Sequence, residues 1–255
     1  MEVFLNPDAW IALLTLTFLE IVLGIDNIIF ISIATGKLPA EKRKRATKIG
    51  MFLAMFMRIA LLFGINLLIQ MKEPWFHIDF SWFSAGITGQ SVILLLGGLF
   101  LIYKSTNEIR EKVDERGEEE KEIKEAATKS FQNVILQIIM IDIVFSFDSI
   151  LTAVGMTNGV EGALYIMITA VVISVFIMMQ FAVPVGTFVN KHPSIQILGL
   201  AFLILIGMML LTESAHLSDA LIFGNHVTPL PKGYLYFAIT FSLVVEMINM
   251  KIKKK

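Results

Sequence analysis

The chain has 255 residues, of which 56% are hydrophobic and only 17% are charged, and its mean hydropathy is +0.74. This balance excludes an ordinary soluble domain, because the apolar residues fall in blocks long enough to cross a bilayer. The formal net charge is -1, and no basic patch with interleaved aromatic residues suggests a nucleic-acid ligand. Since cysteine is absent, disulfides, thiolate metal sites and cysteine nucleophiles are excluded as well.

Seven apolar segments follow one another along the chain, and each is long enough to span a membrane as a helix. Continuous runs of this length differ from the alternating strands of an outer-membrane barrel. We therefore predict an all-α membrane protein with seven transmembrane helices. They span residues 10–33, 47–70, 88–104, 131–155, 162–187, 195–213 and 233–250. The residues before the first helix carry no charged n-region and no small-residue cleavage site, so we expect no cleaved signal peptide.

Basic residues alternate between the segments that connect these helices. Eighteen Lys and Arg residues follow the first, third, fifth and seventh helices, whereas only Lys72 and Lys232 lie in the other segments. Because cytoplasmic segments keep the positive charge, we predict the N-terminus outside and the C-terminus in the cytoplasm. Trp10, Trp75 and Trp82 then fall at the outer interface, where tryptophan is enriched.

An acidic motif occurs twice, once in the first predicted helix and once in the fourth. Residues 19–28 read LEIVLGIDNI, and residues 141–150 read IDIVFSFDSI. A shift of 122 residues superimposes Glu20 on Asp142, Gly24 on Ser146, Asp26 on Asp148 and Asn27 on Ser149. Because the second copy begins three helices later, an odd number, it enters the membrane from the opposite side. This predicts an inverted repeat, which places a substrate site near the midplane in many secondary transporters.

The repeat predicts how the chain is organised. Residues 1–104 form a first three-helix repeat, 105–130 a charged cytoplasmic linker, 131–213 the second, inverted repeat, and 214–255 an outer loop, the seventh helix and a basic tail.

Four carboxylates within the membrane need compensation, because an ionised carboxylate at a helix centre costs about 2.5 to 3.5 kcal/mol. Arg58 is the only basic residue in the interior of a predicted span, since Lys48 and Lys104 lie at span ends. It could be a counter-ion to these acids, or its side chain could extend toward an interface. Bound cations or protons must supply the rest, which suggests proton-coupled transport of a cation. Oxygen ligands from carboxylates, Asn27 and Ser149 suit manganese, calcium or magnesium.

The six-residue spacing of the two acids in each motif leaves the site geometry open. Residues i and i+6 on a straight helix differ by about 120° around the axis and about 9 Å along it. A break at Gly24 and Ser146 would bring both acids to one site, whereas unbroken helices would favour separate sites. No histidine lies in a predicted span, which disfavours zinc and copper. Pairs such as Met51 and Met55, or Met178 and Met179, could bind copper(I), although methionine more often fills a core.

The two acidic motifs resemble those of the TerC family of integral membrane proteins, and Gly97–Leu101, Lys104–Glu108 and Phe241–Glu246 resemble the family too. The resemblance covers nearly the whole chain. It implies manganese export across the bacterial inner membrane, in a family named for tellurium resistance, with no prosthetic group. The ligands that it implies for the transported metal are Glu20, Asp26, Asn27, Asp142, Asp148 and Ser149.

Other functions fit parts of this pattern. An exporter of an amino acid or another cationic solute would use the same acids, and so would a channel. In an intramembrane aspartyl protease, Asp26 and Asp148 would share a proton. However, the Gly-x-Gly-Asp signature of such proteases is missing, so we expect a protein that is not an enzyme. Its expected partners are a divalent metal ion and the lipid bilayer.

Overall fold

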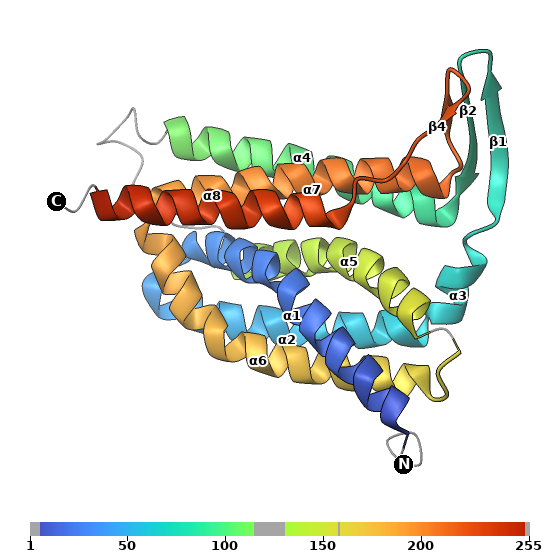
Figure 1. Ribbon diagram of the computed structural model, residues 1–255. Coiled ribbons are helices and arrows are strands. Elements are labelled where there is room, and N and C mark those ends of the chain that lie inside the picture. The colour runs from blue at the N-terminus through green and yellow to red at the C-terminus, as the bar shows by residue number, and fades with distance from the viewer. Residues whose placement is uncertain (1–5, 115–130, 158, 253–255) are drawn as a thin grey trace. The chain divides into compact units, whose positions relative to one another are not determined.

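The computed structural model describes residues 6–114, 131–157 and 159–252, and of Asp26 only the backbone (Figure 1). Within these ranges, seven helices are long and apolar enough to cross a membrane, which confirms the predicted all-α membrane class. They are α1 (Pro7–Gly36), α2 (Ala40–Phe63), α4 (Gly89–Asp114), α5 (Phe131–Met156), α6 (Ala163–Lys191), α7 (Pro193–Leu217) and α8 (Lys232–Ile252). A short helix, α3 (Ile65–Gln70), follows α2.

Several helices extend beyond the apolar segments that predicted them. α2 begins at Ala40 directly after Pro39, so the basic residues at positions 42–45 lie in its first turns. α4 continues to Asp114, ten residues beyond its predicted end, and an ion pair of 3.5 Å joins Arg110 to Asp114 one turn later. Charged residues with good helix propensity extend a helix into water, whereas hydropathy marks only the part within lipid. The predicted linker 105–130 thus begins as helix, and its residues 115–130 lie outside the described ranges.

The described helices fall into two compact units, and each unit combines early and late parts of the chain. One unit contains α1, α2, α5 and α6. The other contains α3, α4, α7, α8 and four strands. The first two long helices of each predicted repeat therefore share one unit, and the third helix of each lies in the other. These packing units do not follow the ranges 1–104 and 131–213, and the inverted repeat stays a prediction.

In the first unit, α1 runs parallel to α6 and α2 packs against α5. Gly24 of α1 lies opposite Met178 of α6, and Gly36 lies opposite Asn190 twelve residues further along both helices. In the other pair, a methyl group at Gly50 of α2 would lie 2.9 Å from Cδ1 of Ile138. Small residues at such points allow transmembrane helices to approach closely. The close approach brings the middle of all four helices together.

The second unit is built on α4 and α7, which pack antiparallel along their length. Gly98 and Gly207 face each other where the two helices are closest, and near one end the Ser214 hydroxyl donates to the Ser91 carbonyl at 2.6 Å. α8 packs on α7 and leaves most of its apolar surface exposed, as expected of a helix that faces lipid.

A small antiparallel sheet, in the order β1-β2-β3-β4 within the described residues, joins the two predicted outer loops. Its strands are β1 (Pro74–Phe80), β2 (Phe83–Thr88), β3 (Leu221–Ile222) and β4 (Asn225–His226). The sequence predicts loops in both segments, because hydropathy averaged over a membrane span does not detect strands this short. In Figure 1 the strands run across the direction of α4 and α7, and Trp75 and Trp82 of the hairpin are exposed.

Replacement of Gly98 by alanine tests the α4–α7 contact. Its methyl group would lie 2.7 Å from the Gly207 carbonyl oxygen, and backbone cannot move aside cheaply. We expect a loss of roughly 1 to 3 kcal/mol in the free energy of unfolding in detergent, as for other overpacked sites. Gly155→Ala is the control, because no described atom lies within 4 Å of the added methyl group. Equal stability of the two variants would contradict the described packing.

Candidate functional site

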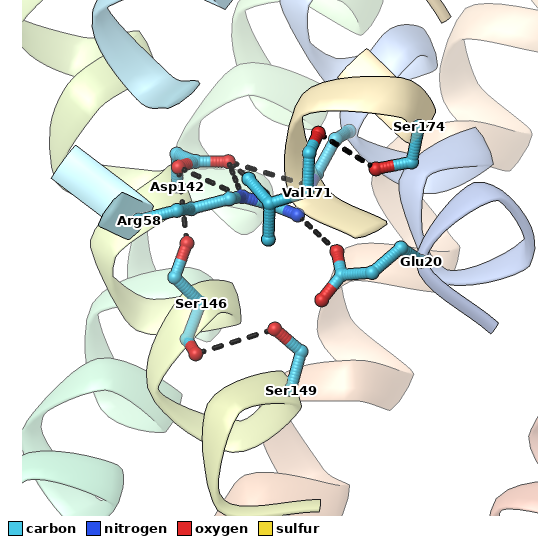
Figure 2. Close-up of polar contacts among 8 residues, drawn as sticks. Glu20, Arg58, Asp142, Ser146, Ser149, Val171 and Ser174 are labelled. Carbon is cyan, nitrogen blue, oxygen red and sulfur yellow. Dashed lines mark hydrogen bonds and ion pairs between the residues drawn. The ribbon is translucent and has the colours of Figure 1, made fainter. Parts of the chain in front are cut away.

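A cluster of three charged side chains lies at the centre of the α1–α2–α5–α6 unit (Figure 2). The Arg58 guanidinium on α2 stands between Glu20 on α1 and Asp142 on α5. Nη1 lies 2.5 Å from Oε2 of Glu20, and Nη2 lies 2.8 Å from Oδ1 of Asp142. Nε is 3.3 Å from both oxygens of Asp142. Each of the three residues is 5% exposed or less, so the ion pairs are shielded from water.

The geometry of arginine explains how one residue holds two acids. Its planar guanidinium carries five N–H donors in a fixed fork, so two carboxylates can bind to different edges. Burial of a charge is costly unless the charge is paired and hydrogen-bonded. Arg58 therefore acts as the counter-ion to the acids, the first of the two roles that the sequence allowed. Its burial excludes the alternative, a side chain that extends to an interface.

Polar residues of the acidic motifs surround Asp142. The Ser146 hydroxyl donates to Oδ2 of Asp142 at 3.0 Å, and the Asn27 amide nitrogen lies 3.5 Å from Oδ1. The Ser149 hydroxyl donates to the Ser146 carbonyl at 3.2 Å. Both copies of the motif thus contribute to one buried hydrogen-bonded cluster.

The helical repeat explains which motif residues meet. Glu20, Gly24 and Asn27 follow one another at intervals of four and three, so they share one face of α1. The equivalent face of α5 carries Asp142, Ser146 and Ser149. The first acid of each copy therefore points into the centre of the unit.

The second acid of each copy lies on another face. α1 and α5 are both continuous helices through Gly24 and Ser146, so the structure does not contain the break that one shared site would require. Asp148 is buried, but it lies about 120° around α5 from Asp142. The side chain of Asp26 is outside the described part of the chain. Unbroken helices favour separate positions for the two acids of each copy.

The predicted metal ligands are therefore only partly gathered. Among the described side chains, no group of three or more histidines and carboxylates is placed to hold a metal ion. Three predicted ligands, Glu20, Asn27 and Asp142, lie in the cluster with Arg58, and Ser149 joins it through Ser146. The full set stays a prediction. The arrangement provides oxygen ligands for a cation. The guanidinium of Arg58 already lies between two of these ligands, the carboxylates of Glu20 and Asp142.

Sequence reasoning missed two contributions to this centre. In the sequence, Ser146 aligns with Gly24 as part of the repeat but has no predicted role. Because Ser146 and Asp142 are four residues apart, one helical turn, the Ser146 hydroxyl can donate to the Asp142 carboxylate. Ser174 of α6 is fully buried beside the cluster and donates to the Val171 carbonyl at 3.0 Å (Figure 2). No motif marks Ser174, because a serine in an apolar helix is common and its neighbours come from distant parts of the chain.

The chain resembles known membrane proteins over nearly its whole length. Residues 5–255 match the family described as "Integral membrane protein TerC family". The UPF0053 inner membrane protein YgdQ of Escherichia coli K12 is 47% identical over 98% of this chain and 96% of its own length. A UPF0053 protein of Haemophilus influenzae is 45% identical over 98% and 96%. The UPF0053 inner membrane protein YoaE of E. coli K12 is 42% identical over 98% of this chain, which spans 44% of YoaE. No solved structure matches the chain.

Replacement of Arg58 by methionine tests the electrostatic role of the cluster. The variant leaves two buried carboxylates without their cation, so we expect the free energy of unfolding in detergent to fall by about 3 to 5 kcal/mol. Adding Glu20→Gln and Asp142→Asn removes the uncompensated charge and should restore most of the loss. If the triple variant is no more stable than Arg58→Met alone, the ion pairs do not balance the buried charge.

Proposed function

The chain belongs to the TerC family of integral membrane proteins, and from that premise we propose that it exports a divalent metal ion, manganese, across the bacterial inner membrane. One observation carries the proposal: a carboxylate from each copy of the acidic motif meets the other at a single buried arginine. The names of the relatives, which include "inner membrane protein", support the location. The basic residues support a cytoplasmic C-terminus and an outer N-terminus.

The charge of the cluster favours a cation as the substrate. Glu20 and Asp142 contribute two negative charges and Arg58 one positive charge, so the three groups together carry a net negative charge. A purely structural ion pair would be neutral, because excess charge in a low-dielectric interior is costly. A buried centre with surplus negative charge attracts a cation.

The ligand chemistry fits manganese, as it fits other divalent cations that prefer oxygen ligands, and it disfavours zinc and copper. Carboxylate and amide oxygens are hard ligands, the chain has no cysteine, and the one histidine within the described long helices, His216, lies in the last turn of α7. In the proposed cycle the metal ion replaces the guanidinium between Glu20 and Asp142, and Arg58 returns when the metal leaves. Because Arg58 balances only one of the two acids, one proton taken up on release would neutralise the cluster. Metal export is then coupled to proton entry.

A second candidate substrate is suggested by Arg58 itself. The seat between Glu20 and Asp142 holds a guanidinium at 2.5 Å and 2.8 Å, so the same carboxylates could bind the side chain of a free arginine. An exporter of a cationic amino acid would use that geometry. A competition measurement distinguishes the two candidate substrates. Free arginine should inhibit manganese uptake if it binds between Glu20 and Asp142.

Manganese uptake into everted membrane vesicles tests the proposal. We expect Glu20→Gln and Asp142→Asn each to lower the uptake rate by about tenfold or more, as the loss of groups at a metal site does. Asp114→Asn is the control, because Asp114 is an exposed acid on the charged end of α4. Wild-type rates in both folded cluster variants would refute the site. Inhibition of uptake by free arginine would instead favour the amino-acid exporter.

A further inference from the structure

A methionine side chain lies against the acidic motif of α1. Met178 of α6 is buried, and its thioether sulfur occupies the space beside Gly24. A side chain of any size at Gly24 would collide with Sδ of Met178. Glycine at this position of the motif therefore lets the sulfur approach the α1 backbone.

The sulfur is close to the charged cluster along α1. Gly24 lies one turn beyond Glu20 and one turn before Asn27, on the face that points into the unit. Glu20 binds Arg58, and Asn27 lies beside Asp142. The thioether therefore meets α1 at a position that lies, along the helix, between two residues of the cluster. Ser174 lies one turn before Met178 on α6, so the same face of α6 carries a hydroxyl as well.

The two copies of the motif differ at this position in the chemical group beside the helix. In the second copy Ser146 replaces Gly24, and its hydroxyl donates to Asp142. In the first copy the glycine leaves the place open, and the Met178 thioether fills it. At the motif position where the second copy carries a hydroxyl, the first copy thus has a thioether from another helix.

We propose that Met178 is a selectivity-determining ligand that makes the site prefer a transition metal over magnesium and calcium. The proposal rests on metal transport at the cluster, and it names the ligand that distinguishes one divalent ion from another. Magnesium and calcium bind oxygen and gain nothing from a thioether, and magnesium gives up its waters reluctantly. Manganese and cadmium accept oxygen ligands and tolerate sulfur better. A thioether in the place of a water therefore favours the softer ions.

Replacement of Met178 by leucine tests the inference, because this exchange nearly conserves volume and rarely disturbs a core. The measurement is manganese uptake into everted vesicles in the presence of competing magnesium or cadmium. In the wild type we expect cadmium to inhibit at much lower concentration than magnesium. In Met178→Leu we expect the ratio of the two inhibitory concentrations to fall by about tenfold, the lower end of what loss of a metal-site group costs. Met209→Leu, a buried methionine of α7 in the other unit, is the matched control and should keep the ratio.

X-ray absorption at the cadmium edge provides a measurement that does not depend on flux. Because the chain has no cysteine, sulfur bound to cadmium in the purified protein must come from methionine. We expect a sulfur neighbour in the wild type and in Met209→Leu, and its loss in Met178→Leu. An all-oxygen environment in the wild type, or a ratio that Met178→Leu leaves unchanged, would overturn the role of Met178. Absence of manganese uptake by the wild type would refute the transport function itself.

Discussion

The fold depends on how two carboxylates are compensated in the middle of a membrane. Glu20 and Asp142 share the Arg58 guanidinium, and each of the three residues is 5% exposed or less. This requirement draws α1, α2 and α5 to one point, and α6 closes the unit by packing parallel to α1. Small residues along these contacts, such as Gly24 and Gly50, make the approach close enough for a side chain of one helix to reach another. The same interaction that stabilises the unit leaves it one positive charge short, and the proposed transport of a cation rests on this deficit.

Because α1 and α5 are continuous helices, the two acids of each motif lie on different faces of their helix. A straight helix cannot point residues six positions apart in the same direction, so the first acids of the two copies meet and Asp148 lies on another face. The residues of the motif therefore lie at two different positions in the protein. The first acids lie in the cluster with Arg58, and Asp148 lies on another face of α5. In the proposed transport cycle, the Arg58 guanidinium is an internal cation that occupies the place of the substrate between cycles.

Much of this could be predicted from the sequence, since the physical signals are local. Apolar blocks identified all seven long helices, and the cost of buried charge pointed to Arg58 as a candidate counter-ion to the motif acids. The features that could not be predicted depend on contacts between distant segments. Nothing local pairs α1 with α6 or places Met178 beside Gly24. β1 pairs with β2, which follows it directly in the sequence. However, β3 and β4 of the same sheet lie more than a hundred residues later. Hydropathy also underestimated α4, because its last turns are stabilised in water.

The central claim is that the transported cation and the guanidinium of Arg58 compete for the same two carboxylates. The dissociation constant of manganese for the purified Arg58→Met variant in lipid nanodiscs, compared with that of the wild type, tests it most directly. Since the variant keeps Glu20 and Asp142 and removes their internal cation, the account predicts tighter manganese binding and a gain in stability on adding the metal. Manganese binding that is unchanged or weaker in Arg58→Met would contradict the claim, because the guanidinium and the metal would then not share a seat.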